Sequence, residues 1–98
     1  MAVAFVRDLP GVAPEVYDAI VAQMGLDEDP PVGLIVHAAG SFGNDIWREI
    51  EVWESREAWE TFYQNRIVPA VVRVLGETVL DGPPPPAPEY MDVHDLIQ

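Results

Sequence analysis

A single histidine, His37, interrupts the apolar segment Gly-Leu-Ile-Val-His-Ala-Ala-Gly at residues 33–40. Two carboxylates, Glu49 and Glu51, lie in the alternating segment 46–53, which follows after a turn-rich connection. If the two segments pair as a hairpin, His37 should lie opposite Trp47, Glu49 or Glu51, which all share one parity. A carboxylate beside an imidazole orients its tautomer and raises its basicity, which suits a general base. The alternative is a structural His–Glu pair in the core of a dimer.

The second histidine, His94, follows Asp92 by two residues in the last segment of the chain. We expect this segment on the opposite edge of the sheet from His37, about three strand spacings or ~14 Å away. His94 is therefore a candidate catalytic residue only if a dimer brings the two imidazoles together, and an interface or surface role is favoured. No HxH or HExxH pattern is present, so no metal site is predicted.

Aromatic and cationic side chains could line a pocket around these groups. Trp47 and Trp53 share the parity of Glu49 and offer flat walls for an aromatic or polyene substrate, although packing across a dimer interface would use them equally well. Arg7 could hold a substrate carboxylate or enolate. The predicted substrate-binding residues are Trp47, Trp53, Phe5, Arg7, Tyr63, Asn65, Tyr90 and Asp92.

The composition restricts the function classes. The chain has 98 residues, a length typical of one domain over residues 1–98, and 49% of them are apolar. The net charge of −12 argues against a nucleic-acid partner, because phosphate binding needs a basic surface. No lysine is present for Schiff-base chemistry, and the absence of cysteine fits a cytoplasmic protein. No membrane span or signal peptide is expected.

The hydrophobic periodicity predicts a β-α-β-β-α-β order, the ferredoxin-like arrangement of the α+β class. Right-handed crossovers give the strand order 4-1-3-2 in an antiparallel sheet, with both helices on one face. Pro69 should kink the second helix or begin another one, and the proline-rich segment 77–88 should form a stiff spacer. The predicted strands are 2–8, 32–39, 46–53 and 89–97, and the predicted helices are 14–24, 56–68 and 69–76.

Period-two alternation divides the strand residues into an apolar face and a mixed face. We assign the apolar face to the helices: Ala4, Val6, Leu34, Val36, Ala38, Ile50, Val52, Met91 and Val93. The mixed face is too aromatic for water and too polar for a sealed core, so we expect a second copy to cover it. This face comprises Val3, Phe5, Arg7, Ile35, His37, Trp47, Glu49, Glu51, Trp53, Tyr90, Asp92, His94 and Leu96.

The order of elements and three segments resemble a known superfamily. The segments are Val-Arg-Asp-Leu-Pro-Gly-Val at 6–12 with Tyr-Asp at 17–18, Trp-Arg-Glu-Ile-Glu-Val-Trp-Glu-Ser-Arg-Glu-Ala-Trp-Glu-Thr-Phe-Tyr at 47–63, and Val-His-Asp-Leu-Ile at 93–97. They are similar to dimeric α+β barrel proteins, and within these to the antibiotic-biosynthesis-monooxygenase-like group. The resemblance covers nearly the whole chain except 77–88, which looks like an insertion. It implies a homodimer with one pocket per subunit between sheet and helices.

The resemblance also bears on the reaction. Haem-degrading members use a helix histidine as iron ligand, and the segment 56–68 has none. Cofactor-free oxygenases of the group use a tryptophan, an asparagine and a tyrosine near the pocket, residue types that Trp59, Asn65 and Tyr63 supply. We therefore expect no cofactor.

Together these observations lead to one functional hypothesis and one rival. The hypothesis is a cofactor-independent enzyme of secondary, polyketide-like metabolism, which acts on a hydrophobic oxygenated substrate as a monooxygenase or as a cyclase or isomerase. His37 would be its base, with Glu49 or Glu51 as the orienting group. The rival is a non-catalytic dimeric protein that binds a small molecule or serves as an accessory subunit.

Overall fold

The elements follow one another in the predicted β-α-β-β-α-β order of the α+β class. In the computed structural model, which describes residues 1–98, the antiparallel sheet has the order β2-β3-β1-β4, as predicted. The strands are β1 (Val3–Pro10), β2 (Leu34–Gly43), β3 (Ile46–Trp53) and β4 (Met91–Asp92). The helical elements are α1 (Pro14–Met24), α2 (Arg56–Phe62), the π-helical η1 (Tyr63–Ile67), α3 (Val68–Leu75) and the 3-10 helix η2 (Glu77–Asp81).

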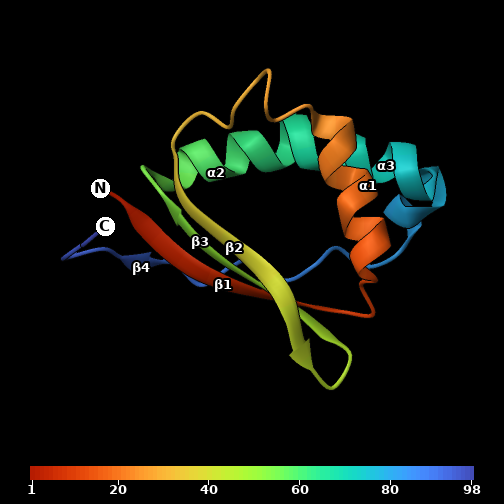
Figure 1. The fold of residues 1–98 in the computed structure, drawn as a ribbon, viewed down its shortest axis with the longest axis horizontal. Helices are drawn as coiled ribbons and strands as arrows, with labels where there is room; N and C mark the ends of the chain where they lie inside the picture. Colours follow the sequence, from red (N-terminus) through yellow and green to blue (C-terminus); the bar gives the residue numbers. More distant parts are fainter.

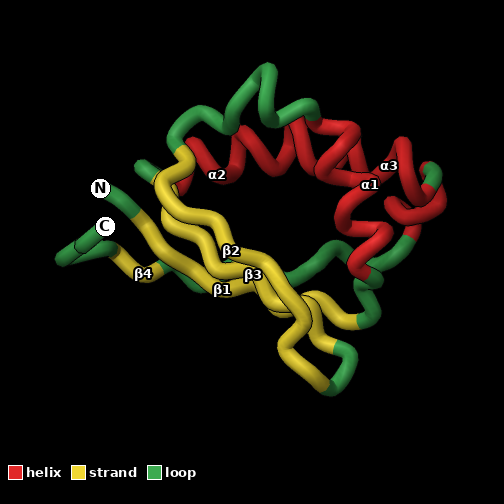
Figure 2. The backbone as a smooth tube through the Cα atoms, viewed as in Figure 1, coloured by secondary structure: helices red, strands yellow, loops and turns green.

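All helices lie on one side of the sheet, which leaves the other face without a helical cover (Figures 1 and 2). α2 lies over β3, whereas α1 packs against α3 and η1. No helix combines the length and the apolar character that crossing a membrane requires. This two-layer arrangement is the ferredoxin-like architecture that the sequence predicts.

The assignment of the two sheet faces is wrong, because the mixed face is the one that packs against the helices. Phe5 and Trp53 on this face are 5% and 1% exposed and contact Trp59 of α2. Large aromatic rings bury more area than small aliphatic side chains, and ion pairs or hydrogen bonds satisfy the carboxylates among them. The uncovered face instead carries Val6 and Ile50, which are 50% and 48% exposed.

A β-bulge adds a second correction on β2. Leu34 pairs with Trp53, but the next pair is Val36 with Val52, so one residue of β2 is extra. The bulge reverses the alternation, because a one-residue insertion moves the following side chains to the other face. Leu34 therefore packs against the core, whereas Val36 lies on the uncovered face.

The second helical segment changes form ahead of Pro69. Proline has no N–H for a helical bond, and its ring collides with the carbonyl four residues earlier. The chain widens into η1, where the Val68 amide donates to the Tyr63 carbonyl five residues back, and α3 then starts with Pro69 in its first turn. The predicted break at Pro69 is confirmed as the start of a new helix.

Only β3 has the predicted bounds, and β1 spans Val3–Pro10 instead of 2–8. β2 continues through Gly43, and the hairpin turn is confined to Asn44 and Asp45, which have φ angles of 51° and 62°. Asparagine and aspartate tolerate this left-handed conformation, which suits a tight hairpin. β4 has two residues instead of the predicted 89–97. One backbone hydrogen bond continues its pairing past Asp92, from the Val93 amide to the Ala2 carbonyl at 2.9 Å.

Candidate functional site

A chain of three hydrogen bonds links one side chain of α1 to three side chains on the helix-covered face of the sheet. The Tyr17 hydroxyl of α1 lies 2.7 Å from His37 Nε2, and His37 Nδ1 lies 2.6 Å from Glu51 Oε2. Trp53 Nε1 donates to the other carboxylate oxygen of Glu51 at 3.0 Å. The hairpin register pairs His37 directly with Glu51, so the predicted carboxylate neighbour of the imidazole is confirmed.

The donors and acceptors in this chain determine the histidine tautomer. Glu51 accepts on both oxygens, so its partner Nδ1 carries a proton and donates. In the neutral imidazole Nε2 then holds the lone pair, which accepts the Tyr17 hydroxyl proton. Only 3% of the Glu51 side chain is exposed, whereas 33% of the His37 side chain is exposed. A buried carboxylate thus orients an imidazole that solvent can reach.

The same contacts shift the pKa values of His37 and Tyr17. The hydrogen bond from His37 to Glu51 stabilises the imidazolium and raises the pKa of His37 above its ordinary value of 6.5, although partial burial opposes this. Burial, together with the charges of Glu49 and Glu51, raises the pKa of Tyr17 to about 12. Tyr17 therefore stays a phenol near neutral pH and acts as a hydrogen-bond donor.

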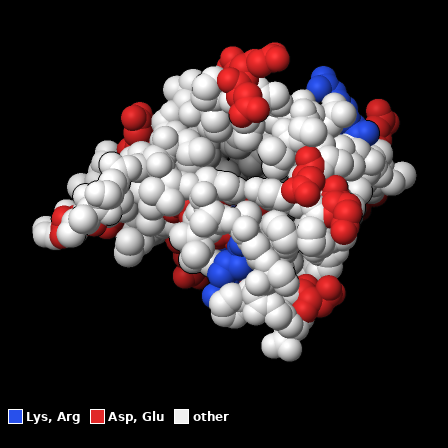
Figure 3. All heavy atoms as spheres, viewed as in Figure 1, with Lys and Arg blue, Asp and Glu red and all other residues white.

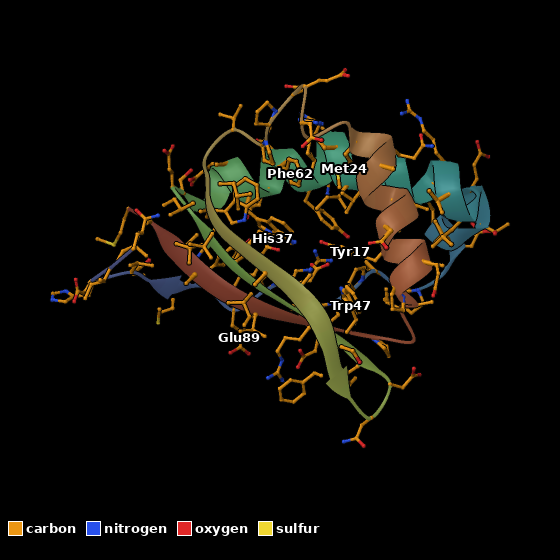
Figure 4. The ribbon with its side chains drawn as sticks, viewed as in Figure 1. Tyr17, Met24, His37, Trp47, Phe62 and Glu89 are labelled. Atoms are coloured by element: carbon orange, nitrogen blue, oxygen red, sulfur yellow. The ribbon has the colours of Figure 1, made fainter.

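Trp47 carries a buried donor next to this chain. Its indole ring is 4.9 Å from the ring of Tyr17, and its Nε1 is buried with no hydrogen-bond partner. Orphaned buried N–H groups are rare in proteins, so such a group is a candidate contact for a ligand acceptor atom. Figure 4 shows Tyr17, His37 and Trp47 in the space between the sheet and the helices. The surface is hollowed between these two layers in Figure 3.

A second polar group occupies the neighbouring strand β1. Arg7 Nη1 donates to Glu49 Oε1 at 3.1 Å, and the Arg7 guanidinium lies 5.1 Å from the Trp59 ring centre and 5.4 Å from that of Tyr63. Burial raises the pKa of Glu49, whereas the charge of Arg7 opposes this. Glu49 therefore pairs with Arg7, and Glu51 is the carboxylate that orients His37.

The remaining predicted site residues divide into those near the two polar groups and those far from them. Phe5 belongs to the core cluster, and Tyr90 packs against it edge to face at 5.5 Å. Asn65 is exposed on η1, and Asp92 and His94 are exposed at the β4 edge, opposite β2. These last three side chains are not brought to His37. No cluster of three or more His, Cys, Asp or Glu side chains could hold a metal ion.

Tyr17 is the site residue that sequence reasoning missed. The helix predicted over 14–24 has a stripe of apolar and aromatic residues at helical spacing, and its members Tyr17, Ile20, Val21 and Met24 are all partly buried. The first residue of this stripe is Tyr17 itself, so the stripe is the signal that would have placed its hydroxyl against the sheet.

Comparisons with protein-family models and with curated proteins find no match to this chain.

Proposed function

We propose that this chain is a cofactor-independent enzyme in which His37 removes a proton from a hydrophobic, oxygenated small molecule. The observation that carries the proposal is the chain Tyr17–His37–Glu51, with a buried carboxylate at one end and a solvent-accessible imidazole in the middle. The resemblance to the antibiotic-biosynthesis-monooxygenase-like group supports the same class of chemistry. The substrate class is a ring compound with an acidic C–H or a phenol beside a carbonyl, of polyketide type.

The first step requires a free lone pair on His37 Nε2, which Tyr17 occupies in the structure. An entering substrate with a carbonyl oxygen would take over the Tyr17 hydroxyl as its own hydrogen-bond donor. Nε2 is then free to accept the proton from the substrate carbon, and the electron pair of the C–H bond moves into the enolate. The tyrosine is suited to this exchange, because its raised pKa keeps the proton on its oxygen.

Glu51 stabilises the charged form of His37 that this proton transfer produces. Proton transfer converts His37 to imidazolium, whose Nδ1–H already faces the Glu51 carboxylate at 2.6 Å. Trp53 holds the second oxygen of Glu51, so the carboxylate needs no rearrangement when the charge appears. Glu51 therefore acts as the positioning residue, and Trp47 Nε1 supplies a further donor for the oxygen of the enolate. The enolate then reacts either with dioxygen, as in a monooxygenase, or with an internal carbonyl, as in a cyclase or isomerase.

We further propose that two copies pack sheet to sheet to form a dimeric α+β barrel. The uncovered face is apolar and exposed at its centre: Val6, Val36 and Ile50 are 50%, 37% and 48% exposed, and Met91 at its edge is 61% exposed. A contiguous apolar face of a sheet without a helical cover is a typical protein-interaction surface. A two-fold axis would cover both copies at once, and the site of each subunit would remain between its own sheet and helices.

The rival function, a non-catalytic binding or accessory protein, also has an observation in its favour. Both ring nitrogens of His37 have protein partners, as in a structural histidine whose hydrogen bonds are satisfied. The enzyme and the binding protein are therefore distinguished by the effect of replacing His37.

The test compares the unmodified protein with His37→Asn, using anthrone and 2-tetralone as hydrophobic C–H acids. Deuterium uptake by each probe in D2O is followed by NMR, and the mass of the particle by ultracentrifugation. The enzyme hypothesis predicts catalysed exchange that falls by about 100-fold or more in the variant, while the dimer persists. Exchange no faster than in buffer, or a variant that loses the dimer but keeps the exchange rate, would refute the catalytic role.

A further inference from the structure

A second cavity opens at the β1 edge of the inner layer, two strands away from His37 on β2. Its volume is about 280 Å³. β4 pairs with β1 only at Val3 and Ala4, so the edge of β1 beyond these residues has no strand partner. Residues 84–88 border the cavity on the outside, and the side chains of α2, η1 and β1 form its inner wall.

Arg7 is the cation of this cavity, and it has hydrogen-bonding capacity left over. Its only protein acceptor is one oxygen of Glu49, reached through Nη1. Arg48 offers a contrast within the same protein, because its Nε and Nη2 both donate to Asp8, at 2.7 and 2.8 Å. The corresponding Nε–Nη2 edge of Arg7 has no protein acceptor. A planar guanidinium edge of this kind matches the two oxygens of a carboxylate.

The rest of the lining is suited to a flat ring. The rings of Trp59 and Tyr63 contact each other and both lie beside the Arg7 guanidinium, and Tyr90 and the prolines of 84–88 form the remaining apolar surface. A proline-rich wall is stiff, so it loses little conformational entropy when a ligand binds. One positive edge surrounded by aromatic and proline surfaces is the arrangement expected for a small apolar group that carries a single anionic head.

We propose that this cavity binds a small aromatic carboxylic acid, with the carboxylate on the Nε–Nη2 edge of Arg7 and the ring against Tyr63, Tyr90 and the proline segment. A multiply charged anion fits less well, because Glu60 lines the same cavity and Glu49 already shares the arginine. The site is independent of the proposed proton abstraction, since none of the residues Tyr17, His37 and Glu51 lines it.

Glu49 provides the sharpest test, because it competes with the ligand for Arg7. Glu49→Gln removes the competing charge and leaves the arginine in place, so benzoate binding should tighten several-fold. The double variant Arg7→Gln with Glu49→Gln removes both charges together, which avoids an unpaired buried carboxylate. It should bind benzoate about 10- to 100-fold more weakly than Glu49→Gln does, the range expected for hydrogen bonds to a charged group.

Calorimetric titration with benzoate measures these affinities, and benzyl alcohol serves as the neutral probe. Arg73→Gln, on the exposed surface of α3, and His37→Asn should both bind benzoate like the unmodified protein. Equal affinity for the two probes would overturn the proposal, as would unchanged benzoate binding in the double variant. Absence of benzoate binding to Glu49→Gln at millimolar concentration would overturn it too. Loss of binding in His37→Asn would place the ligand at the other site, so this failure is distinguishable from a failure of the proposed enzyme function.

Discussion

At the scale of single residues, the proposed chemistry depends on how Glu51 holds His37. The carboxylate is almost completely buried and accepts hydrogen bonds on both oxygens, from His37 and from Trp53. Such a carboxylate stabilises the imidazolium more than the neutral ring, and the pKa of His37 is raised accordingly. The basicity of His37 is therefore a property of the pair.

Replacing Glu51 by Gln should lower the pKa of His37, because the amide keeps the shape of the carboxylate but not its charge. The pKa of the imidazole is measured by NMR titration in a His94→Gln background, so that one histidine remains. We expect a pKa of His37 above 6.5 with Glu51 present and a lower pKa in the variant, because the hydrogen bond to the charged carboxylate is the main cause of the rise. A pKa of His37 that does not change would show that Glu51 contributes no charge stabilisation.

The same shift has a consequence for stability. The folded-state pKa of His37 lies above the unfolded value, so the pair stabilises the fold fully at a pH below about 6.5. This contribution is lost as the pH rises through the raised folded pKa. In urea unfolding, the difference in free energy between the unmodified protein and His37→Gln should therefore shrink from pH 5.5 to pH 9. A difference that grows with pH would contradict the assigned direction of the shift.

At the scale of elements, the hairpin could be predicted from the sequence better than the faces of the sheet. Strict alternation in β3 and the turn residues before it gave the pairing of His37 with a carboxylate. The face assignment failed because alternation separates two sets of side chains without saying which set the helices cover. Helix residues such as Trp59 decide this question, since they add aromatic surface to the ring-bearing face. The bulge in β2 leaves no mark in the alternation, because the residues around it are all apolar.

Gly33 fixes the start of β2 against α2 and provides a test of this packing. Its φ angle is 90°, and a Cβ at this position would lie 2.8 Å from the Cβ of Ala58. Gly25, which caps α1 with a φ of 61°, has open space around the same position. Gly33→Ala should therefore lower the free energy of unfolding by about 2–4 kcal/mol, from backbone strain plus the clash, and Gly25→Ala by about 1 kcal/mol. Equal losses in urea denaturation would show that the contact with α2 is not tight.

At the scale of the whole molecule, the aromatic side chains of the sheet lie on the inner face together with Arg7, Glu49 and Glu51, and the outer face carries aliphatic side chains and the Arg48–Asp8 ion pair. Most of the core is made of rings from β1, β3 and α2. The outer face carries Val6, Val36 and Ile50, which are between 37% and 50% exposed in a single subunit. This distribution agrees with the proposed dimer, in which a second copy covers the outer face. It also explains why an uncovered face could be predicted from the sequence, but not which set of side chains forms it.

A lysine at the centre of the outer face should prevent the proposed dimer. Ile50→Lys places a charge where the partner sheet would pack, and an unpaired buried charge costs several kcal/mol. The dissociation constant should rise by about 100-fold or more, as measured by ultracentrifugation over a concentration series. Leu80→Lys is the matched control, because Leu80 is 61% exposed on η2, away from the sheet. If Ile50→Lys has the same mass as the unmodified protein at every concentration, the outer face is not the interface.

The pH dependence of catalysed deuterium exchange into anthrone tests the central claim most directly. The rate should fall toward low pH with an apparent pKa above 6.5 that matches the NMR titration of His37, because protonation of Nε2 removes the base. In Glu51→Gln the same limb should move to lower pH, and in His37→Asn it should disappear together with most of the exchange. A catalysed rate whose pH dependence is the same in all three proteins would contradict the assignment of His37 as the base.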